Sequence, residues 1–223
     1  MKTMKSVALS TVVAASMLAS FSAQAGSFSS NIGVTNNYIY RGVTQGSDDS
    51  AVQGGIDYDH GNGIYAGTWI SSLGGGNQYE QDWYFGYNFS VGGGVDLDVG
   101  YIMYTYPVGN ANADFDELYV NATYQNFGAG IALTLGSDDD TTAEFSDGDL
   151  YLYVSAEFEL KKDVTLTVLY GDYDFDNAAG ADYSHIQLAL AKGDFTFAYE
   201  SNDLSGAAGD ARVTVSWGQS FDL

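Results

Sequence analysis

Apolar and polar side chains alternate with a period of two residues in segment after segment, and this feature most limits the possible fold. The clearest segment runs from Leu150 to Leu160, where every second residue is apolar. Successive side chains of a β-strand point to opposite faces, so each such segment predicts a strand with one apolar and one polar face. About twelve segments of this kind follow one another, which indicates an all-β fold.

The connections between the expected strands alternate between short and long. Five short turns are expected around Gly61, Gly93, Asn126, Lys162 and Gly193. The six long connections are mostly acidic and cover 41–50, 74–77, 107–114, 136–149, 172–182 and 200–210. This asymmetry predicts a transmembrane antiparallel up-and-down β-barrel of about 12 strands, with short periplasmic turns and long acidic extracellular loops. Each strand has roughly the nine to eleven residues that a tilted crossing requires.

A soluble β-sandwich also has alternating strands, so periodicity alone does not select the membrane barrel. Aromatic residues near the expected strand ends favour the barrel, because such residues form girdles at the membrane interfaces. The expected girdle residues are Tyr38, Tyr40, Tyr58, Tyr79, Phe89, Tyr170 and Phe221. In this interpretation the first strand runs from Phe28 through Tyr40. Leu152, Val154 and Ala156 are expected to face hydrocarbon.

The first 25 residues have the pattern of a secretory signal peptide. Lys2 and Lys5 precede an apolar run from Val7 to Leu18, and Ala23-Gln24-Ala25 provides the small residues of a cleavage site. We therefore expect residues 1–25 to be cleaved and residues 26–223 to form an outer-membrane β-barrel. The alternative, a membrane anchor, fits poorly because the apolar run is short.

The segment Asn36-Asn37-Tyr38-Ile39-Tyr40-Arg41-Gly42-Val43-Thr44-Gln45 resembles the opening motif of the TorF-type porins of Gram-negative bacteria, a Gcw_chp-type outer-membrane protein family. The similarity continues through Gly54-Gly55-Ile56-Asp57-Tyr58 and 63–69, and is specific over about 31–72. The resemblance implies an outer-membrane barrel that acts as a channel. It implies no catalytic or ligand-binding residues.

Composition excludes several other classes of function. The formal net charge is −22, and cleavage of the leader would leave five basic residues against 29 acidic ones. Such a surface repels phosphate groups, so nucleic acid is not an expected partner. There is no cysteine, and hence no disulfide or thiolate metal site. The expected partners are outer-membrane lipid and lipopolysaccharide, small hydrophilic solutes and, during biogenesis, the barrel-assembly machinery. The last strand resembles the recognition signal of that machinery, although it ends in Leu223 with Phe221 two residues earlier.

No catalytic residue, cofactor or metal ligand is predicted. The two histidines are His60, in an expected turn, and His185, on an expected lumen-facing position. Acidic runs in the long loops contain oxygen ligands suited to calcium or magnesium, but none has EF-hand spacing. These runs include Asp48-Asp49, Asp138-Asp139-Asp140, Asp147 with Asp149, Asp172-Asp174-Asp176, and Asp203 with Asp210. A solvated acidic surface is the favoured interpretation.

Six inward carboxylates are expected near the periplasmic mouth of the barrel, where they would form an acidic collar. They are Asp57, Asp59, Asp96, Asp98, Glu157 and Glu159. Arg41 is the only obvious inward cation and is expected at the opposite, outer end. Because rings of Asp and Glu favour cations in pores, the collar predicts cation preference if the lumen is open. Ordinary water-facing carboxylates at a barrel rim are the competing interpretation.

Three functions are consistent with these patterns. The first is a passive, cation-preferring channel for small hydrophilic solutes, and the second is a closed barrel that acts in adhesion or envelope structure. The third is a lipid-modifying enzyme, for which no serine-containing motif gives support. Eight inward aromatic residues are expected to fill a narrow barrel: Tyr65, Trp69, Tyr84, Tyr104, Tyr119, Tyr151, Tyr153 and Tyr173.

Overall fold

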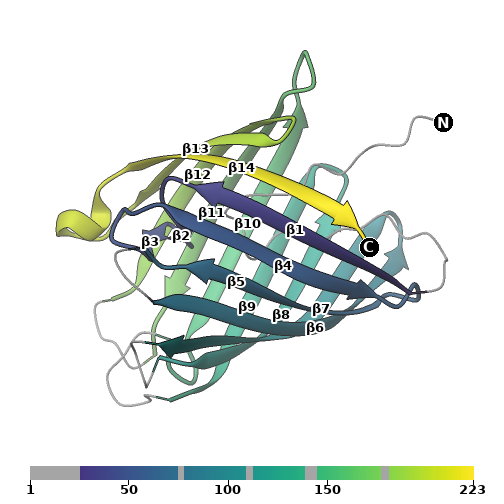
Figure 1. Ribbon diagram of the computed structural model, residues 1–223, viewed down its shortest axis with the longest axis horizontal. Coiled ribbons are helices and arrows are strands. Elements are labelled where there is room, and N and C mark those ends of the chain that lie inside the picture. The colour runs from purple at the N-terminus through teal and green to yellow at the C-terminus, as the bar shows by residue number, and fades with distance from the viewer. Residues whose placement is uncertain (1–25, 75–77, 109–112, 139–144, 177–180) are drawn as a thin grey trace.

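The chain folds into a closed antiparallel β-barrel (Figure 1). The computed structural model describes residues 26–74, 78–108, 113–138, 145–176 and 181–223. The expected signal peptide therefore lies outside the described residues. The barrel strands are β1 (Ser27–Thr35), β4 (Ala51–Asp59), β5 (Ile64–Ser72), β6 (Tyr79–Gly92), β7 (Val95–Val108), β8 (Phe115–Tyr124), β9 (Phe127–Ser137), β10 (Leu150–Glu159), β11 (Thr165–Asp174), β12 (Tyr183–Lys192), β13 (Phe195–Asn202) and β14 (Arg212–Asp222).

Each strand pairs with its neighbour along the chain, and β1 closes the barrel by pairing with both β4 and β14. Val34 lies opposite Val52 on one side and opposite Trp217 on the other. Closure leaves no free sheet edge, so the backbone groups of every strand can be paired inside a lipid bilayer. The predicted fold is confirmed: the barrel has twelve strands joined by alternately short and long connections.

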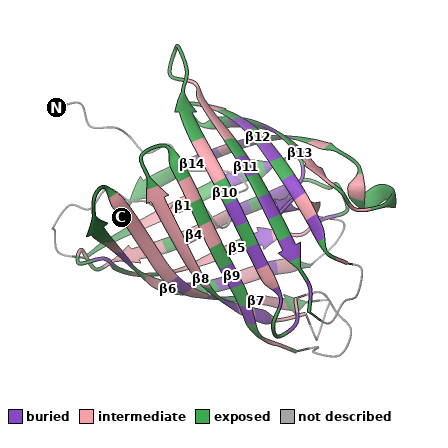
Figure 2. Ribbon diagram, turned by 180° about the vertical axis from the view of Figure 1, so that it is seen from behind, coloured by how far each residue is buried: buried purple, intermediate pink, exposed green. Residues whose placement is uncertain are grey.

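The outward face of the barrel is apolar. On β10, Leu152 and Val154 are exposed, whereas Tyr151 and Tyr153 point inward and are buried. Buried and exposed residues alternate in this way along the strands, as Figure 2 shows most clearly on β11 to β13. A wide band of exposed aliphatic and aromatic side chains is unfavourable in water but suits contact with hydrocarbon. Among the described residues, no helix combines the length and hydropathy that a membrane crossing needs.

A charge on this outward face should therefore disturb folding more than a charge on the inward face. We expect Val154→Arg, on the exposed face of β10, to destabilise the barrel by about 2–4 kcal/mol in lipid. Ser155→Arg, at the adjacent inward position, should cost much less because its side chain can reach water in the lumen. The measurement is urea unfolding in phospholipid vesicles, and equal losses for the two variants would contradict the assignment of the two faces.

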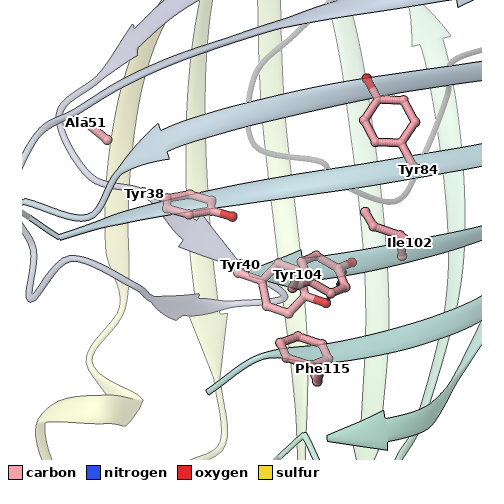
Figure 3. Packing of buried hydrophobic residues seen from close by; sticks show 7 residues of the cluster. All are labelled: Tyr38, Tyr40, Ala51, Tyr84, Ile102, Tyr104 and Phe115. Atoms are coloured by element: carbon pink, nitrogen blue, oxygen red, sulfur yellow. Dashed lines mark hydrogen bonds between the residues drawn. The ribbon is translucent and has the colours of Figure 1, made fainter. Parts of the chain in front are cut away.

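The first strand is shorter than predicted, and this corrects two of the girdle residues. β1 ends at Thr35, whose hydroxyl donates a hydrogen bond to the carbonyl oxygen of Asn37 (2.9 Å). The chain then turns into the barrel and forms a small hairpin of β2 (Ile39–Tyr40) and β3 (Val43–Thr44). Tyr38 and Tyr40 are consequently buried inside the barrel and do not face the membrane interface (Figure 3).

The hairpin has a two-residue turn made of Arg41 and Gly42. Their φ angles are 46° and 84°, and Tyr40 pairs directly with Val43. Two consecutive positive φ angles define a type I′ turn, which matches the twist of the strands it connects and favours glycine at its second position. Space is an additional constraint, because a Cβ atom on Gly42 would lie 2.5 Å from Cβ of His185 on β12. The tip of the hairpin thus packs against the barrel wall at β12.

Candidate functional site: the barrel lumen

The walls of the lumen are lined by tyrosines, in agreement with the predicted inward positions. All eight inward aromatic residues named from the sequence are buried or half-buried. Several of the rings lie over a glycine of the neighbouring strand. A Cβ atom would lie 2.3 Å from the Tyr65 hydroxyl oxygen at Gly86, and 2.3 Å from that of Tyr119 at Gly100. Because these glycines have no side chain, the tyrosine rings can lie against the barrel wall and line the lumen.

The hairpin occupies the half of the lumen next to the long connections, called the outer half below. The Tyr40 hydroxyl donates a hydrogen bond to that of Tyr104 on β7 (3.2 Å), and the ring of Tyr104 stacks on Phe115 at 4.4 Å between centroids. Tyr38 packs edge-on against Trp69 of β5, with 5.6 Å between ring centroids. Figure 3 shows Tyr38, Tyr40 and Tyr104 gathered inside the barrel wall. The aromatic residues of the outer half therefore enclose the hairpin.

Arg41 carries the strongest contact of the hairpin. Its two terminal nitrogens donate to the two carboxylate oxygens of Glu117 on β8, both at 2.7 Å. The guanidinium carbon lies 4.1 Å from the ring centroid of Tyr151 and 5.1 Å from that of Tyr173. The side chains of the ion pair are 4% and 1% exposed. The planar guanidinium group forms two parallel hydrogen bonds with a carboxylate and stacks on aromatic rings, so lysine could not replace arginine at this position without losing contacts.

Further contacts hold the tip and the base of the hairpin. The Asn202 side-chain amide donates to the carbonyl oxygen of Gly42 (2.8 Å). At the base, Asn37 donates to Asp48 (2.7 Å), and Arg212 at the start of β14 forms an ion pair with the same carboxylate (2.5 Å). The hydrogen bond from Arg212 lowers the pKa of Asp48 from its ordinary value. The hairpin is thus tied to the barrel at both ends.

Residues 145–149, the described segment just before β10, also pack against the hairpin. Phe145 stacks on Phe115 with 4.7 Å between ring centroids and contacts the rings of Tyr40 and Tyr173 at 6.1 Å and 5.8 Å. Asp149, at the end of the same segment, is fully buried and accepts a hydrogen bond from the backbone N–H of Asp176 (2.9 Å). Burial raises the pKa of Asp149. The hairpin and residues 145–149 therefore both occupy space in the outer half of the lumen.

The residues of the expected acidic collar lie in different surroundings. Asp57 accepts hydrogen bonds from the Tyr84 hydroxyl (2.5 Å) and from Asn31 (3.4 Å). Asp98 accepts from the Tyr65 hydroxyl (2.7 Å) and from Asn121 (3.3 Å). Both carboxylates are held inside the lumen by neutral donors.

The other four collar residues lie closer to the periplasmic turns. Asp96 accepts from the Ser90 hydroxyl (2.5 Å), and Asp59 accepts from the backbone N–H of Gly61 (2.7 Å). Glu157 and Glu159 are exposed near the end of β10. The structure therefore places Asp57 and Asp98 among lumen tyrosines, and the other four residues at the rim.

The two histidines also differ. His60 is exposed in the β4–β5 turn and shares a hydrogen bond with the Tyr58 hydroxyl (2.9 Å). His185 is buried against the hairpin and hydrogen-bonds the Tyr151 hydroxyl through Nε2 (3.0 Å). Among the described residues, no three acidic or histidine side chains are grouped closely enough to hold a metal ion.

Sequence reasoning missed the hairpin and the buried acids around it. The signal for the hairpin was present in Tyr40-Arg41-Gly42-Val43, because glycine at the second turn position between β-favouring residues is typical of a type I′ hairpin. The buried acids Glu80, Asp82 and Glu117 had no comparable signal, since a lumen-facing carboxylate is ordinary in a porin-like pattern. Their surroundings arise from contacts with neighbouring strands and with the segment that enters the lumen.

A closed barrel with an apolar exterior and a polar, tyrosine-lined interior belongs to the class of transmembrane β-barrels. Solved structures share this fold. The KdgM porin matches with a TM-score of 0.54 at 8% identity, covering 87% of this chain and 98% of that chain. The same porin in complex with disordered oligogalacturonate gives 0.52 at 8% identity, with the same coverage. A structure from a study of in-meso crystallization of membrane proteins gives 0.57 at 7% identity, covering 88% and 83%.

The family can be stated more narrowly. The family described as "Bacterial protein of unknown function (Gcw_chp)" matches residues 20–206, so the chain belongs to the Gcw_chp family. No curated protein matches the chain.

Proposed function

We infer that this protein is an outer-membrane channel for small hydrophilic solutes that prefers cations, with a lumen narrowed by the β2–β3 hairpin. The observation that carries the proposal is a polar, carboxylate-bearing lumen inside a closed barrel with an apolar exterior. The shared fold with the KdgM porin supports a channel, and the resemblance of 36–45 to TorF-type porins points the same way.

Cation preference follows from the charges in the described part of the lumen. Arg41 is the inward basic residue there, and Glu117 neutralises it. Asp57 and Asp98 receive only neutral donors, so no basic side chain among the described residues pairs with either carboxyl group. Rings of carboxylates favour cations in pores, and low-dielectric walls strengthen the field.

Charge selectivity can be tested by removing collar charges without changing side-chain size. In a salt gradient across a planar bilayer, we expect a cation-selective reversal potential that weakens at high salt. The triple variant Asp57→Asn, Asp96→Asn, Glu157→Gln should shift this potential toward zero. Asp210→Asn, an exposed acid in the loop before β14, serves as the matched control and should not shift it. Anion preference in the unmodified protein, or an unchanged potential in the triple variant, would contradict the proposal.

The narrowed outer half of the lumen favours a second candidate, a closed barrel with a role in adhesion or envelope structure. The two proposals differ in conductance: a channel gives discrete current steps in a bilayer, and a closed barrel gives none in repeated preparations. The location proposed for either is the outer membrane, in contact with lipid and lipopolysaccharide, after export by the leader and insertion by the barrel-assembly machinery.

The proposed orientation has its own test. The turn that contains Lys161 and Lys162 is short and exposed, and it lies on the same side as both ends of the barrel. If this side faces the periplasm, trypsin added to intact cells should leave the turn uncut. Permeabilising the outer membrane should then allow cleavage there. Cutting in intact cells would mean that the orientation is reversed.

A further inference from the structure

Two acidic residues near the extracellular end of the barrel lack any charge partner. Glu80 and Asp82 lie two residues apart on β6, so their side chains point to the same face, into the lumen. Both are 1% exposed. Their surroundings are Tyr38 of the inward loop, Trp69 of β5, which lies opposite Asp82, and Tyr104 of β7, which lies opposite Asp82 on the other side. Side chains of the inward loop, β5 and β7 therefore enclose the pair.

The hydrogen bonds of this pair are incomplete. Glu80 accepts from the Tyr38 hydroxyl (2.9 Å) and interacts with the hydroxyl of Tyr106. No hydroxyl or N–H group donates to either carboxylate oxygen of Asp82, although both oxygens are buried, and the carboxyl group lies within hydrogen-bonding reach of that of Glu80. The nearby Glu117 adds a further negative charge, and Arg41 already neutralises it. A fully buried carboxylate without a donor is rare and requires an explanation.

No basic residue of the described chain can supply the missing charge. Besides Arg41, they are Arg212, Lys161, Lys162 and Lys192. Arg212 is paired with Asp48, and the three lysines are exposed beside periplasmic turns, at the opposite end of the barrel. Burying unpaired charge costs several kcal/mol per group, so a proton or a cation from solution must balance the pair.

We propose that Glu80 and Asp82 form a binding site for a hard cation of the calcium class. Carboxylate and hydroxyl oxygens are the ligands that such cations prefer, and two carboxylates match a double positive charge. Asp82 would contribute its two oxygens, to which no hydroxyl or N–H group donates, with Glu80 beside it and tyrosine hydroxyls at the edge. No third acidic or histidine side chain joins them among the described residues, so neutral oxygens must complete the coordination.

The site has a consequence for the loop that enters the lumen. Tyr38 precedes β2 and donates to Glu80, so a cation at the pair would reinforce the position of the hairpin. The pair lies near the start of β6, at the end of the barrel that carries the long connections. The inference does not require conduction: binding is measurable in a silent barrel. Failure of the proposed channel would therefore not contradict the cation site, and absence of the cation site would not contradict the channel.

The test uses full-length barrel refolded in detergent without lipopolysaccharide, because that lipid binds divalent cations itself. Calcium chloride is added at constant ionic strength, and the thermal unfolding midpoint and retained radioactive calcium are measured. We expect a rise in the midpoint and about one calcium per chain. Asp82→Asn should weaken binding by at least roughly tenfold, since charge count sets affinity in such sites. Asp57→Asn, a lumen acid outside the pair, should bind like the unmodified protein.

Glu80→Gln provides a second variant if Asp82→Asn does not fold, and it should also lose affinity. Three outcomes would overturn the inference. Equal calcium binding by the unmodified protein and by both variants would place the ion elsewhere. No retained calcium and no shift in the unmodified barrel would mean that the two carboxyl groups share a proton. Sodium chloride at equal ionic strength is the control, and an equal shift with sodium would indicate general charge screening and contradict a specific site.

Discussion

Replacing Arg41 by methionine is expected to release the hairpin from the barrel wall. The substitution leaves Glu117 buried without its cation, and breaking one side of a buried pair costs about 3–5 kcal/mol. Glu117 can regain water only if the hairpin moves away, so the loss should appear as local opening. Hydrogen exchange at the backbone N–H of Gln45, which bonds the carbonyl of Tyr38 (2.8 Å), reports this opening. Its protection should fall by more than about 100-fold, since 1.4 kcal/mol is a factor of ten.

Two further variants make this prediction specific. The double variant Arg41→Met, Glu117→Leu removes both charges and should restore much of the protection, because a well-packed apolar pair can replace a buried ion pair. Arg212→Met breaks the ion pair with Asp48, which is 56% exposed, and should lower the protection of the Gln45 N–H less than Arg41→Met does, because Asp48 remains in water. Equal effects of Arg41→Met and Arg212→Met would show that the buried pair does not hold the hairpin.

The second large effect is expected at the tip of the hairpin. Gly42→Ala places a methyl group 2.5 Å from Cβ of His185, an atom that no side-chain rotation can move away. Overpacking of this kind costs about 1–3 kcal/mol, in addition to about 1–2 kcal/mol for the positive φ of 84°. Gly193→Ala is the matched control, because its φ is 58° and no atom lies within 4 Å of the added Cβ.

Both glycine variants are compared by the same hydrogen-exchange measurement and by urea unfolding. Gly42→Ala should lower the protection of the Gln45 N–H strongly, and Gly193→Ala should leave it unchanged while lowering global stability slightly. If the two variants have the same effect on the hairpin, then contact with His185 does not position the tip.

The strands were predictable because each carries its own signal. Alternation along 150–160 identifies both the existence of β10 and its outward face, since a shift of one residue would expose polar groups to lipid. The tight turns were equally local, as the Asn62-Gly63 pair before β5 illustrates. The twelve-stranded barrel therefore follows from patterns that span about ten residues at a time.

The content of the lumen was not predictable in the same way. Tyr38 and Tyr40 continue the period of two beyond Thr35, and an aromatic residue suits a membrane interface as well as a packed interior. Their true partners are distant in sequence: Tyr38 meets Glu80 at a separation of 42 residues, and Arg41 meets Glu117 at 76. Such contacts depend on closure of the barrel, which no local pattern encodes. The cation-preferring collar remains a prediction for the same reason.

Single-channel recording of the unmodified protein beside a variant without the hairpin tests the proposed channel most directly. In this variant a short Gly-Ser linker replaces residues 38–44, while Asn37 and Asp48 at the base of the loop are kept. We predict small discrete conductance steps for the unmodified barrel and clearly larger steps for the variant, because the hairpin narrows the outer half of the lumen. Equal conductance in the two proteins, or silence in both, would contradict a channel restricted by this hairpin.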